Sequence, residues 1–257
     1  MKKTIGILGG MGPEASAYMF QLIIKHTKVK QDQDHAPCVL LSLPQIPPRT
    51  EAILGKGPSP VPLLIEGTRR LQAAGADFII MPCITAHYFL DEVQPHSPLP
   101  FINLLEECSS WVENHLSRVR TLGLVASTGT VISKLFHHSM EKLGKKVIQP
   151  TPEEQEKVMM AIFGPGGIKA GTTSGPPKET VVQIAHSLIT RGAEAIIAGC
   201  TEIPLVLFPT DISVPLVASL QAFAAPVVVG IILAAAVRAR LKSLCAKSRI
   251  LWSFVKA

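Results

Sequence analysis

The stretch Thr4-Ile-Gly-Ile-Leu8 decides the fold, because the chain repeats it 117 positions later as Thr121-Leu-Gly-Leu-Val125. The same offset carries Gly12 onto Gly129, Gly75-Ala-Asp77 onto Gly192-Ala-Glu194, Ile79-Ile80 onto Ile196-Ile197, and Cys83 onto Cys200. A repeat of this length indicates two similar supersecondary units. We therefore expect two lobes related by a pseudo-twofold axis, with one cysteine thiol from each lobe facing a cleft on that axis.

Short apolar, β-branched runs alternate with longer amphipathic stretches along the chain. The short runs, which we predict to be buried parallel strands, are Thr4–Leu8, Cys38–Leu43, Phe78–Met81, Thr121–Val125, Lys146–Gln149 and Ala195–Ala198. The amphipathic stretches, which we predict to be helices, are Glu14–Thr27, Val61–Ala74, Leu104–Leu116, Val131–Leu143, Pro152–Phe163 and Lys178–Arg191. Such alternation predicts βαβ units with right-handed crossovers. The expected fold class is α/β, with two pseudo-symmetric lobes, each a parallel sheet flanked by helices, and an active site in the cleft between them.

The repeat also sets the expected domains. We place the first lobe at residues 1–117, the second at 118–218, and a C-terminal helix that packs back on the first lobe, with a basic tail, at 219–257. Two Gly/Pro-rich segments, 55–62 and 164–177, interrupt the pattern, and plain loops are the default interpretation. Both lie at the edge where open α/β folds bind ligands, so a mobile closing loop is the alternative for 164–177.

Composition indicates a globular protein with an ample core, since 47% of the 257 residues are hydrophobic and 17% are charged. The longest apolar stretch, Pro226–Val237, is shorter than the ~20 residues of a membrane-spanning helix, and the amino terminus shows no signal peptide. We expect a cytoplasmic protein without a membrane span. The net charge of +6 is carried by six Lys and Arg residues after Asp211. We interpret this tail as solvated, so no nucleic acid partner is predicted; weak binding to membranes or nucleic acid is the alternative.

Two of the five cysteines stand out by position. The number is odd and no pair shows CxxC or zinc-ligand spacing, so neither a disulfide framework nor a structural metal is predicted. Cys38 and Cys108 lie in apolar or helical surroundings typical of buried packing residues. Cys83 and Cys200 each follow a buried strand and precede a predicted helix, where amide dipoles lower a thiol pKa. One such cysteine would be a packing residue; two at symmetric positions favour catalysis.

Cationic and polar residues follow the same strands. Arg49, after two prolines, ends a strand and is suited to a two-pronged bond with a carboxylate, although a solvated loop arginine is equally compatible. Lys169 is a second candidate cation. Gly9-Gly-Met-Gly12 allows N–H groups to approach an anion, but it is not GxGxxG, so a dinucleotide site is not supported. Ser127, Thr128 and Thr130 occupy the matching turn of the second half.

His87 and Glu202 lie beside the two cysteines. His87 follows Cys83 by four residues, which is compatible with a Cys–His couple or a metal pair, while a helix-packing or polarising histidine is the favoured interpretation. Glu202 follows Cys200 by two residues. It is a candidate to orient a partner, cap the following helix or assist proton transfer.

These strings resemble the aspartate/glutamate racemase family over roughly residues 3–217. The matching motifs are Ile5-Gly-Ile-Leu-Gly-Gly-Met-Gly-Pro13, Pro48-Arg-Thr50, Met81-Pro-Cys-Ile-Thr-Ala-His87, Ile168-Lys-Ala-Gly171 and Gly199-Cys-Thr-Glu-Ile-Pro204. The resemblance implies no pyridoxal phosphate, other cofactor or metal, and it implies catalysis at the α-carbon by Cys83 and Cys200. It implies that Arg49 and Lys169 bind the side-chain carboxylate, and that the second-half thiol deprotonates the L-isomer and the first-half thiol the D-isomer. The candidate substrate-binding residues are Met11, Gly12, Arg49, Ile84, Thr85, Ser127, Thr128, Lys169, Thr201 and Glu202.

The chain departs from the family pattern in two places. Ile84 stands where the family has Asn after the first cysteine, and the segment after Val217 becomes apolar and basic. We predict a racemase acting on aspartate, with glutamate or a broader range as alternatives. The apolar run Val227–Val237 indicates a buried helix or a subunit contact, and we predict a homodimer. If two thiols flank one α-carbon, their sulfurs should lie roughly 7–8 Å apart. The departures favour, as a second hypothesis, an inactive paralogue that binds an acidic metabolite; a zinc enzyme is a distant third.

Overall fold

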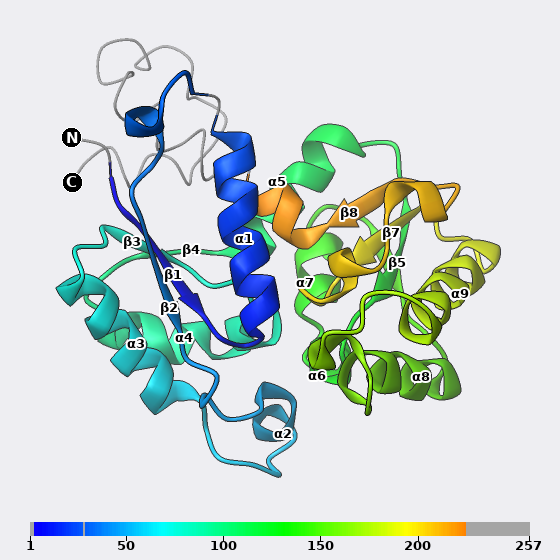
Figure 1. The fold of residues 1–257 in the computed structure, drawn as a ribbon. Helices are drawn as coiled ribbons and strands as arrows, with labels where there is room; N and C mark the ends of the chain where they lie inside the picture. The colour runs from blue at the N-terminus through cyan, green and yellow to red at the C-terminus, as the bar shows by residue number, and fades with distance from the viewer. Residues whose placement is uncertain (1–2, 28, 225–257) are drawn as a thin grey trace.

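Two parallel four-stranded sheets form the centre of the molecule, as a computed structural model describes it for residues 3–27 and 29–224 (Figure 1). The first sheet has the order β2-β1-β3-β4 and the second has the order β6-β5-β7-β8. The strands are β1 (Ile5–Gly9), β2 (Cys38–Ser42), β3 (Phe78–Ile80), β4 (Phe101–Ile102), β5 (Thr121–Val125), β6 (Lys146–Ile148), β7 (Ala195–Ala198) and β8 (Leu216–Ala218). The prediction of a two-lobed α/β fold is confirmed.

The strand register reproduces the sequence repeat residue by residue. Ile5 of β1 pairs with Phe78 of β3, and the residues 117 positions later, Leu122 and Ala195, pair in the second sheet. The loop before each third strand repeats as well. Asp77 accepts the amide N–H of Thr4 at 2.6 Å, and Glu194 accepts that of Thr121 at 2.8 Å. The two halves therefore share backbone hydrogen bonding as well as motifs.

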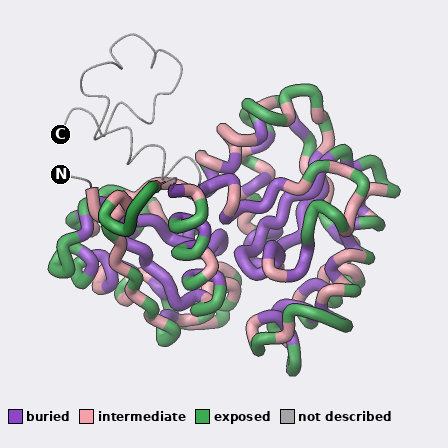
Figure 2. Tube along the Cα trace, turned by 45° about the horizontal axis from the view of Figure 1, so that its top comes forward, coloured by how far each residue is buried: buried purple, intermediate pink, exposed green. Residues whose placement is uncertain are grey.

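Helices cover both faces of each sheet. They are α1 (Pro13–His26), α2 (Arg49–Ile53), α3 (Val61–Ala73), α4 (Leu90–Val93), α5 (Leu104–His115), α6 (Thr128–Ile132), α7 (Leu135–Glu141), α8 (Pro152–Phe163) and α9 (Pro176–Thr190), joined by 3₁₀ turns that include η2 (Thr85–Phe89), η4 (Ile168–Ala170) and η5 (Ile203–Leu205). Side chains of α1, α5 and α7 form one core with the inner faces of both sheets. The outer cores lie under α3 in the first lobe and under α8 and α9 in the second. Figure 2 shows buried backbone, in purple, through the centre of each lobe and exposed segments around it.

The structure differs from the sequence-based elements in several respects. Two short helices, α2 and α4, were not predicted, and Arg49, expected at the end of a strand, is the first residue of α2, because β2 ends at Ser42. The helix predicted over Val131–Leu143 is two helices, α6 and α7, because Lys134 between them has a positive φ of 54° and breaks the helical path. Two edge strands, β4 and β8, were not predicted. They have only two and three residues, which is too short to produce a recognisable apolar run.

The predicted boundary between the lobes lies in a tightly held connection. The buried ammonium of Lys145 donates to the carbonyl oxygens of Leu116, Ser117 and Val119 at 2.9, 3.3 and 2.6 Å. These carbonyls follow the end of α5 and lie at the boundary placed after residue 117. The division into 1–117 and 118–218 stays a prediction.

The chain after the second sheet enters a helix at residues 219–224. The rest of the predicted C-terminal helix, the basic tail, Cys245 and the apolar run Val227–Val237 lie outside the described residues. Within the described residues, no helix is long and apolar enough to cross a membrane.

Candidate active site

A cavity of about 630 Å³ lies between the two lobes, at the carboxyl ends of their central strands. Both repeat units contribute to its walls. The predicted site residues that line it are Met11, Gly12, Arg49, Cys83, Ile84, Thr85, Ser127, Lys169, Cys200, Thr201 and Glu202. The topology explains most of this meeting, because parallel strands present their carboxyl ends, and the loops that follow them, at one edge. Lys169 is the exception, since it lies in η4 after helix α8.

Cys83 follows β3, and the side chain that contacts its sulfur is uncharged. Its side chain is buried, and its sulfur lies 3.5 Å from the hydroxyl oxygen of Thr85. His87 accepts the N–H of Leu104 on Nε2 at 3.2 Å, which leaves Nδ1 to donate to the carbonyl oxygen of Cys83 at 2.8 Å. Burial lowers the pKa of His87 to about 4. The imidazole is therefore neutral and braces the backbone of the cysteine turn against α5, as the packing interpretation predicted.

Cys200 follows β7 and lies in a charged environment. Its thiol donates to Oε2 of Glu202 at 2.9 Å, and the Thr201 hydroxyl donates to the same oxygen at 3.2 Å. Burial, and then the charge of Glu202, raise the pKa of Cys200 well above its usual value of 9.0.

This raised pKa contradicts the expectation that a helix amino terminus lowers the pKa of Cys200. The element after Cys200 is the three-residue 3₁₀ turn η5, and the element after Cys83 is the short 3₁₀ turn η2. A short 3₁₀ turn aligns few peptide dipoles, so it supplies little of the field that a long helix provides. Desolvation of the thiolate and the adjacent carboxylate therefore dominate at Cys200.

Glu202 and Lys169 form an ion pair within the second lobe, and both side chains also contact the first lobe. Oε1 of Glu202 contacts the ammonium of Lys169 and accepts the amide N–H of Gly12 at 3.2 Å. The ammonium also donates to the carbonyl oxygen of Met11 at 3.2 Å. Burial opposes the charged form of Lys169, but Glu202 and Cys200 outweigh it and raise the pKa of the ammonium. A Cβ at position 12 would lie 3.2 Å from both charged groups, so a larger residue would crowd the ion pair.

Arg49 is held against the cavity wall by three backbone carbonyls. Its guanidinium donates to Ile46 at 3.1 Å, to Pro47 at 2.9 Å and to Met11 at 3.1 Å. Its Nε is buried and has no hydrogen-bond partner among the described residues. Arg49 is therefore a fixed cation rather than a solvated loop arginine, and its free donor matches a carboxylate.

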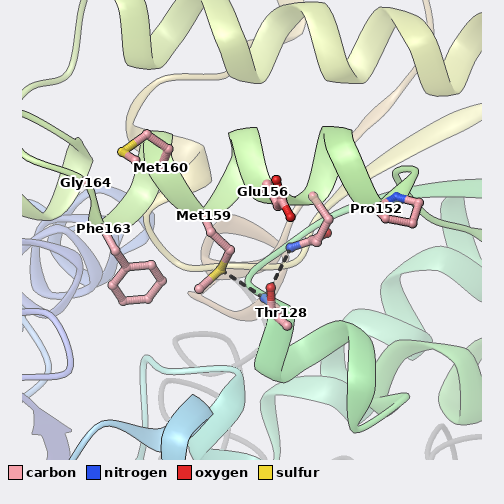
Figure 3. Close-up of a pocket in the computed structure, with 8 residues that line it drawn as sticks. Thr128, Pro152, Glu156, Met159, Met160, Phe163 and Gly164 are labelled. Carbon is pink, nitrogen blue, oxygen red and sulfur yellow. Dashed lines mark hydrogen bonds between the residues drawn. The ribbon is translucent and has the colours of Figure 1, made fainter.

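The remaining predicted residues divide between two places. Ile84 is buried, lines the cavity and packs in the core that joins the lobes. Ser127 precedes α6 without a capping hydrogen bond from its side chain, and its hydroxyl lies 3.4 Å from that of Thr130. Thr128 lies outside the cavity: its N–H contacts Sδ of Met159 at 3.2 Å and its hydroxyl accepts from Gln155 at 3.2 Å, in a neighbouring pocket on α8 (Figure 3).

Sequence reasoning missed several residues of the cavity wall, among them Thr50, Met159 and Phe163. Thr50 was within a recognised motif, but Met159 and Phe163 belong to a helix that carries no chemical motif. Among residues 3–27 and 29–224, no group of three or more His, Cys, Asp or Glu side chains is placed to hold a metal ion.

This arrangement of two facing repeats agrees with the sequence match over residues 8–247 to the Asp/Glu/Hydantoin racemase family. The chain belongs to this family. The resemblance identified from the cysteine motifs is thereby confirmed, and with it the prediction of a racemase family fold.

Solved and characterised relatives extend the match across most of the chain. The structure is similar to the aspartate racemase of Picrophilus torridus, with a TM-score of 0.77 and 27% identity, covering 91% of this chain and 94% of the other. The sequence is 24% identical over 225 residues to the broad specificity amino-acid racemase RacX of Bacillus subtilis (strain 168), covering 84% of this chain and 92% of the relative. The glutamate racemase of Francisella tularensis shares the fold, with a TM-score of 0.62 and 19% identity, covering 86% and 78% of the two chains.

Proposed function

We propose that this protein racemises a free acidic amino acid, aspartate first and glutamate or a broader range as alternatives, with two cysteine thiols and no cofactor. The observation that carries the proposal is that Cys83 and Cys200, one from each repeat, are buried and line one cavity. Two acid/base groups on opposite sides of a carbon are what inversion of that carbon requires.

The charged residues of the cavity support an anionic substrate. Arg49 offers a buried N–H without a partner, and Lys169 carries an ammonium whose charge the site stabilises. Both lie in the same cavity as the thiols. We assign them to the side-chain carboxylate, and we assign the hydroxyl groups of Ser127 and Thr85 to the polar groups on the α-carbon.

The proposed reaction conserves protons and electrons. One cysteine, as thiolate, takes the proton from the α-carbon, and the electron pair of the C–H bond stays on the substrate. The other cysteine, as thiol, donates its proton to the opposite face of the same carbon. The product is the enantiomer, and the two cysteines have exchanged protonation states. Following the family resemblance, Cys200 deprotonates the L-isomer and Cys83 the D-isomer.

Two further proposals accompany the reaction. We propose a homodimer, which light scattering at micromolar concentration tests directly: a monomer mass contradicts it. We also propose that the enzyme acts in the cytoplasm, where free amino acids are abundant substrates.

Exchange of the α-proton tests the function. Purified protein is incubated in D₂O with L- or D-aspartate, and proton NMR follows the α-proton while chiral chromatography follows the enantiomer. We expect loss of the α-proton signal and formation of the opposite isomer from either side. Absence of exchange with every amino acid would overturn the proposal, and tight calorimetric binding of aspartate without exchange would favour the binding-protein hypothesis.

A further inference from the structure

A second pocket lies beside the cavity, along one face of α8 (Figure 3). Its volume is about 510 Å³. It is lined by Thr128, Pro152, Gln155, Glu156, Met159, Met160, Phe163 and Gly164. Thioether, ring and proline groups dominate this set, so the pocket suits an apolar group more than a charged one.

Two side chains, Met159 and Phe163, line both the pocket and the cavity. Figure 3 shows Met159 extending from α8 toward Thr128, whose N–H contacts the Met159 sulfur at 3.2 Å. The ring of Phe163 leaves the end of α8 beside it and lies 5.5 Å from the ammonium of Lys169. These two side chains therefore form a wall with the cations of the cavity on one side and the apolar pocket on the other.

The two faces of this wall differ in chemistry. On the cavity side, Lys169 and Glu202 form an ion pair that favours polar substrate groups. On the pocket side, Met160 and Phe163 remain 64% and 48% exposed, so an apolar ligand group would bury surface that now faces water. The wall separates a site for a short acidic side chain from a space that fits a longer apolar one.

We propose that Phe163, together with Met159, determines side-chain specificity, and that shortening Phe163 joins the pocket to the cavity and admits amino acids with long unbranched apolar side chains. This inference rests on the proposed function, because it assigns the cavity to an amino acid. Each additional methylene buried from water strengthens binding about threefold to fourfold. A chain that extends past the wall by two methylenes therefore gains about tenfold.

The test compares Phe163→Ala with the unmodified protein by calorimetric titration of norleucine and aspartate. We expect Phe163→Ala to bind norleucine at least fivefold more tightly than the unmodified protein. Aspartate should bind no better, because Lys169 loses its ring contact. The α-proton exchange rate of norleucine in D₂O should rise in the same variant. Phe163→Leu keeps an apolar side chain and serves as the second variant if Phe163→Ala does not fold. It should give an intermediate gain in norleucine affinity.

Two control variants test whether the gain in norleucine binding comes from shortening Phe163 rather than from the loss of any exposed ring. Phe163→Tyr keeps the ring and should keep the selectivity between the two amino acids. Phe208→Ala removes a ring that stacks with Lys178 at 4.6 Å, at similar exposure but outside both pockets, and should leave norleucine binding unchanged.

The outcomes distinguish this inference from the function on which it rests. If Phe163→Ala and Phe163→Leu are folded by circular dichroism and both bind norleucine with unchanged affinity, the proposal that Phe163 limits the side chain is overturned. Equal gains in Phe208→Ala do the same. Absence of α-proton exchange in every variant and in the unmodified protein would overturn the proposed racemase function. The titrations would still decide whether Phe163 limits the length of the bound side chain.

Discussion

The two cysteine turns share one backbone plan and differ in charge. In each turn the residue two positions after the cysteine contacts its sulfur: the Thr85 hydroxyl lies 3.5 Å from Cys83, and the Glu202 carboxylate accepts from Cys200 at 2.9 Å. The repeat offset relates Thr85 to Glu202. The same geometry therefore gives one thiol a neutral partner and the other an anionic partner.

The repeat determines where the thiols lie, whereas the side chain that contacts each sulfur differs between the two turns. The position after each cysteine differs too, with Ile84 in the first turn and Thr201 in the second. Such asymmetry is expected under the proposed function, in which one site holds two mirror-image substrates and Arg49 and Lys169 are assigned to one end of each.

Removing either thiol should have the largest effect. We expect Cys83→Ser and Cys200→Ser to lower racemisation about a thousandfold or more, because a hydroxyl is a far weaker base than a thiolate. Each variant keeps one thiol and therefore one face of the α-carbon. Cys200→Ser should still exchange the α-proton of D-aspartate, and Cys83→Ser that of L-aspartate, measured by NMR in D₂O.

A third cysteine provides the control. Cys38 lies outside the cavity, and burial raises its pKa to about 12, so Cys38→Ser should keep racemisation intact. Full activity in Cys83→Ser would contradict the two-base mechanism. Exchange of both enantiomers by a single variant would show that the turns are not specialised.

Replacing Ile84 should have a moderate effect, in opposite directions on activity and stability. Ile84→Asn introduces an amide where the family pattern has one, and a polar contact in a dry pocket contributes ~1–3 kcal/mol. We expect kcat/KM for aspartate to rise about tenfold. Because Ile84 is 2% exposed and packs in the core that joins the lobes, urea unfolding should show a loss of about 2 kcal/mol or more.

The second turn supplies the matched variant. Ile84→Thr copies the residue at the equivalent position, Thr201, and cannot supply an amide. It should lose stability by about 1–2 kcal/mol without the gain in kcat/KM. Equal activity in the Asn and Thr variants would show that Ile84 does not limit turnover.

The fold could be predicted because its signals are local and repeated. The six predicted strands rest on short apolar runs such as Phe78–Ile80, and the repeat offset reproduces the strand register. The edge strands β4 and β8 could not be predicted, since two or three residues carry no periodicity.

The site could be predicted in its positions but not in its electrostatics. Glycine, cysteine and arginine after strands mark the cavity wall, and all the predicted site residues except Thr128 line it. The raised pKa of Cys200 depends on burial and on a carboxylate oriented through Lys169 and Gly12. Those contacts arise from the packing of two lobes, which no local pattern encodes. Phe163 could not be predicted because it lies on a helix that carries no chemical motif.

Removing the charge beside Cys200 should have the smallest effect and the most specific one. Burial and Glu202 both hold the Cys200 pKa above 9, so the thiolate that deprotonates L-aspartate forms only as pH rises. Glu202→Gln removes the repulsion between carboxylate and thiolate and leaves the attraction of Lys169. The Cys200 pKa should therefore fall, and the acid limb of kcat/KM for L-aspartate should move to lower pH.

The first turn is the internal reference for this shift. Thr85 carries no charge, so Glu202→Gln removes no carboxylate that contacts Cys83, and turnover of D-aspartate is the comparison for turnover of L-aspartate. The plateau rates will fall in both directions, because Gly12 loses an anionic acceptor and Lys169 loses its ion pair; the position of the limb, not its height, is the measurement. Glu179→Gln, an exposed charge change on α9, controls for net charge. If Glu202 instead serves as the base that activates Cys200, Glu202→Gln will lose L-aspartate turnover at every pH, and the acid limb will not shift. That result would make the carboxylate part of the proton path and contradict its proposed role of raising the Cys200 pKa.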